Sequence, residues 1–244
     1  MIRKFLTSSH SAREQQELKR DNEIQRIETF SDGVFAFAVT LLIVSLEVPK
    51  TYEELLISMR GFFAFGISFL ILVSIWSEQH RFFRNYGMKD GWTIALNACL
   101  LFIVLFYTYP LKFLFTLIFR DTIYGPNKSP LIISSHQMPS LMIIYALGFI
   151  AIYSLFFLMY LRAWRQSKAR GYTSLEIFDC KSSMYKELIL VLTGLCSLLI
   201  ACFFNEKKVY LAGLIFTLAG PAIGIFYFYR KKRRKLIRQT PSKK

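Results

Sequence analysis

The 244-residue chain has few acidic side chains, with 16 Asp and Glu against 31 Lys and Arg, and it contains three histidines and four cysteines. The cysteines form no Cys-x-x-Cys pair, and His10, His80 and His136 lie far apart in the sequence, so neither a redox motif nor a metal site is indicated. The sequence also has no Gly-x-Ser-x-Gly elbow and no His-Glu-x-x-His motif. We therefore expect no enzyme, no cofactor and no resident metal.

The chain also lacks the signs of a soluble or secreted protein. Residues 1–6 contain no hydrophobic stretch of the length that a cleaved signal peptide needs, so we expect membrane insertion through the first span itself. Hydrophobic residues make up 54% of the chain and aromatic residues 16%. The net charge of +15 is compatible with nucleic acid binding, but the basic residues cluster between apolar stretches and at the C-terminus. That distribution is typical of a membrane protein and indicates no nucleic acid partner.

Six apolar stretches predict an all-α membrane protein with six transmembrane helices. The expected spans cover about residues 27–48, 55–80, 92–115, 140–161, 188–204 and 209–229. Residues 1–26 are predicted to form a cytosolic tail, 162–186 a polar connector, and 230–244 a basic cytosolic tail that meets anionic lipid headgroups. Thr51 and Glu54 predict a capping box at the start of the second span.

The basic residues also predict the orientation in the membrane. With six spans, 24 of the 31 Lys and Arg fall on one side, which holds both termini. Basic residues are retained on the cytosolic side of membranes, so we expect a multi-pass protein of the cell membrane with both termini in the cytosol.

Several polar side chains are expected at one depth in this arrangement. Asp32 lies about two turns, roughly 9 Å, beyond Arg26 in the first span, at a depth where a carboxylate needs protein or water as a partner. Trp76, His80 and Asn97 fall in the same cytosolic third of the second and third spans. Unpaired polar groups are costly in lipid, so a hydrogen-bonded network of these residues with Ser31 is expected. In the alternative, His80 is an interfacial residue beside Arg81, and Asn97 is a helix-packing donor.

Further along the first span, one stripe is marked by helical spacing. Phe37, Thr40, Leu41 and Val44 lie at i, i+3, i+4 and i+7, so they share one face of the helix. Judged by periodicity alone, such a stripe is more often a packing surface than the wall of a pore.

The first span resembles a known family. Arg26, the run Phe30–Ala36 with its Phe-Ser-Asp motif, and the following Ala-Val-Thr-Leu-Leu segment look like the first span of the transmembrane protein 175 potassium-channel family, in its single-repeat prokaryotic form. The similarity extends more loosely through Trp76, His80 and Asn97. In that family the motif is tied to residues of the second and third spans, which is the arrangement expected above.

The resemblance implies a potassium-permeable channel that conducts passively, assembled as a homotetramer around a central pore lined by the first helix. The constriction positions are then Phe37, Leu41 and Val44, with Thr40 as a ring of hydroxyl groups, and potassium is bound only as it permeates. The chain departs from the family where Phe37 replaces a branched aliphatic residue and Val44 replaces leucine. No Thr-Val-Gly-Tyr-Gly carbonyl filter and no arginine-rich voltage-sensor helix occurs in the sequence.

Two other functions are open from the residues alone. Asp32 and His80 are compatible with the proton relay of a secondary transporter, although no charged residue is expected near mid-membrane and no inverted repeat is apparent. Ser31, Asp32 and His80 are the residue types of a catalytic triad, but Ser31 and Asp32 are adjacent on a helix and point about 100° apart.

Overall fold

The computed structural model describes residues 25–43, 49–125, 133–203 and 209–239, and within these ranges every regular element is a helix. Residues 25–43 form what is called the first helix below. It is followed by α2 (Tyr52–Arg60), α3 (Phe62–Tyr86), α4 (Gly91–Ile118), α5 (Arg120–Tyr124), a 3-10 turn η1 (Ser135–Gln137), α6 (Met138–Gln166), α7 (Ser174–Phe203) and α8 (Tyr210–Gln239).

The helix ends follow local sequence chemistry. Thr51 caps α2, where its hydroxyl oxygen accepts a hydrogen bond from the backbone N–H of Glu54, and the Glu54 carboxylate accepts from the N–H of Lys50. At the other end of the second span, α3 stops at Gly87, whose φ of 49° lies in the left-handed region that favours glycine. Asp90 then caps α4 by accepting from the N–H of Thr93.

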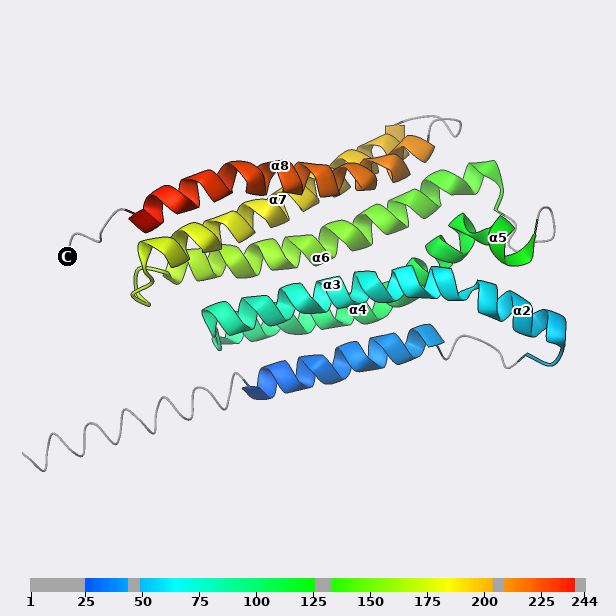
Figure 1. Cartoon of the computed structure of the whole chain (residues 1–244), viewed down its shortest axis with the longest axis horizontal. Helices are drawn as coiled ribbons and strands as arrows, with labels where there is room; N and C mark the ends of the chain where they lie inside the picture. Colours follow the sequence, from blue (N-terminus) through cyan, green and yellow to red (C-terminus); the bar gives the residue numbers. More distant parts are fainter. Residues whose placement is uncertain (1–24, 44–48, 126–132, 204–208, 240–244) are drawn as a thin grey trace, which may run out of the picture.

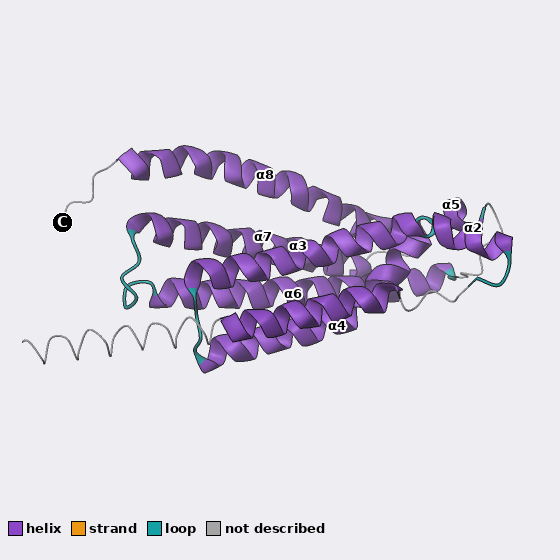
Figure 2. Ribbon diagram, turned by 60° about the horizontal axis from the view of Figure 1, so that its bottom comes forward, coloured by secondary structure: helices purple, strands orange, loops and turns teal. Residues whose placement is uncertain are grey.

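The long helices lie roughly side by side in a fixed order. In Figure 1 the first helix is at one edge beside α3 and α4, α6 lies in the middle, and α7 and α8 form the other edge. The turned view of Figure 2 keeps α8 at an edge and α6 within the bundle. Helix packing is extensive between α4 and α6, between α6 and α7, and between α7 and α8. The first helix therefore has packed neighbours on one side only.

The helix ends alternate between the two ends of the bundle. The start of the first helix, the α3–α4 turn, the α6–α7 turn and the end of α8 all lie at the same end, on the left of Figure 1. The short helices α2 and α5 pack against each other at the opposite end. This alternation is what a chain that crosses a membrane repeatedly requires.

Among the described residues, five helical segments are long and apolar enough to span a membrane, judged by length and composition. They are Tyr52–Tyr86, Gly91–Ile118, Met138–Gln166, Ser174–Phe203 and Tyr210–Lys231. The predicted span at 27–48 is absent from this set. The helix that holds its described part, residues 25–43, is short and contains Arg26, Glu28 and Asp32. Residues 44–48, which include Val44, lie outside the described residues, as do 1–24 of the predicted N-terminal tail and 240–244 of the basic tail.

One helix begins much earlier than predicted. The sequence interpretation placed a polar connector at 162–186 and a span from residue 188, whereas α7 begins at Ser174. Thr173 and Glu176 form a capping box there: the Glu176 carboxylate accepts from the Thr173 N–H, and the Thr173 hydroxyl oxygen accepts from the Glu176 N–H. Residues 174–186 of the predicted connector are therefore helical, and Cys180, Ser182 and Lys186 among them are buried inside the protein.

A continuous core joins the two sides of the bundle. Phe35, Ala38 and Leu42 of the first helix belong to the same buried cluster as Leu100 of α4 and Phe156 of α6. Each buried side chain of this size contributes about 1.5–3 kcal/mol by leaving water, as an upper estimate for a protein surrounded by lipid.

Helices α4 and α6 approach each other closely at Tyr107 and Gly148. The Tyr107 hydroxyl donates to the backbone carbonyl of Tyr145 at 3.0 Å. A Cβ atom placed on Gly148 would lie 2.2 Å from the Tyr107 ring, so glycine is required for the ring to fit.

Asp90 also ties the start of α4 to α6, because the Arg162 guanidinium lies 2.5 Å from its carboxylate. Burial acts to raise the pKa of Asp90, but hydrogen bonds from Thr93 and Arg162 outweigh burial and hold the pKa below its ordinary value. Since the folded pKa is the lower one, Asp90 stabilises the fold at pH values above its unfolded pKa of about 3.9. This stabilisation is lost as the pH falls through the folded pKa.

We predict that Asp90→Ala lowers the free energy of unfolding by about 1 kcal/mol through loss of the cap. Asp90→Asn keeps a capping oxygen and loses the charge, so its deficit is expected at neutral pH. The deficit should shrink as the pH falls below about 3.9 toward the lower folded pKa of the wild-type carboxyl. Thermal unfolding of the detergent-solubilised protein across this pH range measures both. A deficit of Asp90→Asn that does not change with pH contradicts the assignment.

Candidate functional site

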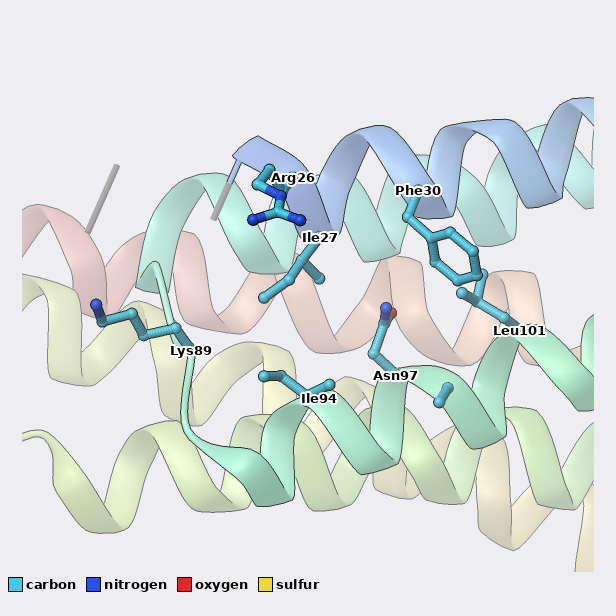
Figure 3. A pocket seen from close by; sticks show the side chains of 8 residues that line it. Arg26, Ile27, Phe30, Lys89, Ile94, Asn97 and Leu101 are labelled. Atoms are coloured by element: carbon cyan, nitrogen blue, oxygen red, sulfur yellow. The ribbon is translucent and has the colours of Figure 1, made fainter. Parts of the chain in front are cut away.

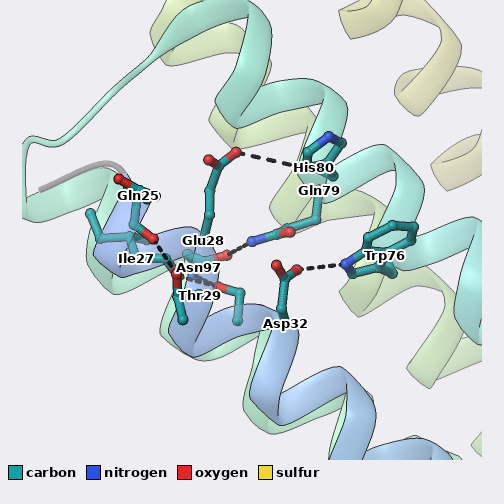
Figure 4. Close-up of polar contacts among 10 residues, drawn as sticks. Gln25, Ile27, Glu28, Thr29, Asp32, Trp76, Gln79, His80 and Asn97 are labelled. Atoms are coloured by element: carbon teal, nitrogen blue, oxygen red, sulfur yellow. Dashed lines mark hydrogen bonds and ion pairs between the residues drawn. The ribbon is translucent and has the colours of Figure 1, made fainter. Parts of the chain in front are cut away.

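The carboxylate of the first helix has a partner on α3. The Asp32 Oδ1 atom accepts a hydrogen bond of 2.7 Å from the Trp76 indole Nε1–H (Figure 4). The Trp76 ring in turn stacks on His80, with ring centroids 5.6 Å apart and an interplanar angle of 18°. Hydrogen bonds to a charged group are stronger than those between neutral groups, so this contact fixes the inner end of the first helix against α3.

A second chain of hydrogen bonds joins three helices. The Asn97 side chain of α4 donates to the Ser31 hydroxyl oxygen at 2.9 Å and accepts from the Gln79 amide of α3 at 3.1 Å. The Ser31 hydroxyl donates to the carbonyl of Ile27 one turn earlier. Ser31, Gln79 and Asn97 are all buried. Buried polar groups need partners: Asn97 finds them on both other helices, and Ser31 and Gln79 each find theirs in Asn97 of α4.

Glu28 and Gln79 belong to this arrangement although the sequence interpretation did not single them out. The Glu28 carboxylate lies 3.8 Å from His80 Nδ1, in the range of an ion pair but too far for a hydrogen bond (Figure 4). Glu28 stands one helical turn before Asp32 and Gln79 directly precedes His80. The helical spacing of Glu28 and Asp32 was the signal that could have identified Glu28.

The structure places Arg26 and Phe30 elsewhere. With Ile27 they line one wall of a groove of about 450 Å³ between the first helix and α4. Ile94 and Leu101 of α4 line the opposite wall, and Lys89 lies at its end (Figure 3). Arg26 and Phe30 were singled out as residues of the first-span motif. Their side chains face an open apolar groove, with Asn97 as the residue shared by groove and network.

The described part of the predicted stripe, Phe37, Thr40 and Leu41, lies away from the most buried face of the first helix. Phe37 is 56% exposed, Thr40 is exposed and Leu41 is half-buried. The Thr40 hydroxyl donates to the carbonyl of Phe37 at 2.7 Å. The opposite face carries Ser31, Phe35, Ala38 and Leu42, whose spacing of three or four residues makes one buried stripe.

A basic side chain of α4 contacts the other end of the first helix. The Lys112 Nζ atom donates to the carbonyl of Leu42 at 2.9 Å. Cations are favourable near the carbonyl end of a helix. The first helix is therefore held near its start by α3 and α4 and near residue 42 by α4.

Comparison with known proteins identifies the group to which the chain belongs. Residues 26–107 match the family described as "Endosomal/lysosomal potassium channel TMEM175". A protein of Marivirga tractuosa named "Potassium channel" is 40% identical to this chain over 230 residues, which is 89% of this chain and 92% of the relative. The chain belongs to the TMEM175 family.

Solved structures of TMEM175 proteins share the fold. The crystal structure of a variant of the potassium channel MtTMEM175, in complex with a nanobody fusion, has a TM-score of 0.74 and 38% identity, and the match covers 85% of this chain and 93% of that one. The crystal structure of a lysosomal potassium-selective channel TMEM175 homolog from Chamaesiphon minutus has a TM-score of 0.57 and 24% identity. This second match covers 85% of this chain and 98% of that one, and shows a likeness of fold.

We predict that Trp76→Phe destabilises the protein. The substitution keeps an aromatic ring against His80 but removes the N–H group that donates a hydrogen bond to Asp32. Loss of a hydrogen bond to a charged group is expected to lower the free energy of unfolding by about 1.5–3 kcal/mol. Trp92→Phe is the matched control, because Trp92 is 70% exposed at the start of α4. Thermal unfolding in detergent, together with the yield of assembled protein, measures the difference. Equal stability of the two variants would show that the Asp32 contact does not hold the first helix.

Proposed function

We propose that the chain is one subunit of a potassium-permeable cation channel that conducts passively, with the first helix lining the ion path. The relatives named above support potassium as the permeating ion. The observation that carries the proposal is the asymmetry of the first helix. One face is tied to α3 and α4 by hydrogen bonds and buried side chains, and the other presents Phe37 and Thr40 outward.

A single copy of this helix cannot enclose a path, so several subunits must surround one axis. We propose a homotetramer, as the family resemblance implies. In this proposal each subunit has six spans, which are the first helix and the five apolar segments described above. With 24 of the 31 basic residues on the side that holds both termini, we place that side in the cytosol.

Side chains on the first helix would then control permeation. Rings of Phe37, Leu41 and Val44 form a narrow apolar neck in this proposal, and the Thr40 hydroxyls supply nearby oxygens. An apolar neck discriminates ions by the cost of removing their water and closes by dewetting. Such a neck requires the helices to keep a fixed rotation, because a turn of one residue would replace the stripe by its neighbours.

The transporter alternative is not favoured. The relatives carry the name of potassium channels. The residues proposed for a proton relay also make separate contacts: Asp32 accepts from Trp76, whereas His80 lies beside Glu28. A channel needs no catalytic residue, so we propose none.

We predict that Leu41→Ala and Phe37→Ala raise the potassium flux severalfold and weaken discrimination against sodium, because shortening the side chains widens the apolar neck. Purified protein in liposomes, with potassium, sodium and caesium gradients compared, gives both quantities. Leu218→Ala is the matched control: Leu218 is 62% exposed and lies on α8, at the edge of the bundle opposite the first helix.

The two possible failures have different meanings. If the flux is unchanged in both first-helix variants, these side chains do not line the ion path. Uptake that concentrates potassium when driven by a proton gradient would favour the transporter instead.

A further inference from the structure

The segment of α3 that holds the first helix has a second attachment on its opposite face. Trp76, Gln79 and His80 lie on one side of α3 and face the first helix (Figure 4). Glu78 falls between them in the sequence, so at about 100° per residue its side chain points to the other side. There it is 7% exposed and faces α6 and α7.

Glu78 belongs to a buried ionic cluster contributed by three helices. The Tyr160 hydroxyl of α6 donates to Glu78 Oε1 at 2.6 Å, and Lys186 Nζ of α7 lies 2.5 Å from Glu78 Oε2. The same ammonium group lies 2.7 Å from the carboxylate of Glu187, a residue with an exposed fraction of 0%. Arg81 lies farther away, 3.4 Å from Glu78 Oε2.

These side chains connect helices that are not extensively packed against each other. The well-packed pairs are α3 with α4, α4 with α6, and α6 with α7. The side chains of Glu78 and Lys186 are therefore long enough to bridge the distance between α3 and α7. A buried charge that loses its partner is strongly unfavourable, so the cluster permits few relative positions of α3 and α7.

We propose that Glu78 and Lys186 are positioning residues for ion conduction: by fixing residues 76–80 of α3 from the side of α7, they set the position of the first helix. Neither side chain has a hydrogen bond or an ion pair with residues 25–43, so the effect passes through α3 to the hydrogen bonds of Asp32 and Asn97. The proposal rests on the proposed function, in which the first helix lines the ion path.

The test compares Lys186→Met, Lys186→Arg and the control Lys168→Met, which removes a charge from an exposed position before α7. We expect Lys186→Met to lower the potassium flux per assembled channel about threefold to tenfold, the range of coupling seen when one member of a connected network is changed. Lys186→Arg retains a cation and should restore the flux to within about twofold of wild type, since the ion pairs can re-form. Lys168→Met should match wild type.

A readout other than conduction separates positioning from general damage. Amide hydrogen exchange of residues 29–36, measured in assembled protein, should be faster in Lys186→Met than in wild type and normal in Lys186→Arg. Normal exchange and normal flux in Lys186→Met would overturn the proposal. If exchange rises in Lys186→Met while Leu41→Ala leaves the flux of the channel unchanged, the positioning role stands and the pore-lining role of the first helix fails.

A triple variant tests the proposal if Lys186→Met fails to assemble. Replacing all three charged groups by neutral side chains of similar size, as Glu78→Gln/Lys186→Met/Glu187→Gln, leaves no buried charge unpaired in the cluster. We expect this variant to assemble with altered flux and faster exchange at residues 29–36. Wild-type behaviour of the triple variant overturns the proposal. Failure of both Lys186→Met and the triple variant to assemble overturns it too, because the cluster would then serve folding alone.

Discussion

The hydrogen bonds that Ser31 and Asp32 make with α3 and α4 determine how the first helix is rotated. A carboxylate, a hydroxyl and an amide that enter the membrane without partners are costly, and these groups find partners in only one arrangement of the three helices. Once Asp32 meets Trp76 and Ser31 meets Asn97, Phe35, Ala38 and Leu42 are turned into the core. The outward direction of Phe37 and Thr40 then follows from helical geometry.

The same requirement operates on the other face of α3. Over residues 76–80, α3 has polar groups that need partners on two sides. The first helix and α4 supply one side, and α6 and α7 supply the other. A helix held in this way has little freedom to rotate, because any rotation breaks contacts on both faces. The bundle thus has two parts: the first helix, α3 and α4 form one, and α6, α7 and α8 form the other (Figure 1).

Depth and pairing arguments from the sequence led to several of these contacts and missed others. The expectation that Ser31, Asp32, Trp76 and Asn97 meet came from their common depth in the membrane, and the structure brings them into hydrogen-bonding distance. The role of these residues in conduction stays a prediction. Hydropathy could not reveal the cluster at Lys186 and Glu187, because polar residues before an apolar run look the same whether lipid headgroups or other helices surround them. The Thr173–Glu176 capping box was the overlooked local signal.

The close approach of Tyr107 to Gly148 limits the distance between the two parts of the bundle. At this crossing of α4 and α6 there is no room for a methyl group, so the separation of the parts is set by a backbone in contact with an aromatic ring. Even an alanine side chain at position 148 would push α4 and α6 apart. On α8, by contrast, a Cβ atom placed on Gly220 or Gly224 would meet no other atom within 4 Å. The distance between the two parts of the bundle at this level therefore depends on a residue that has no side chain at all.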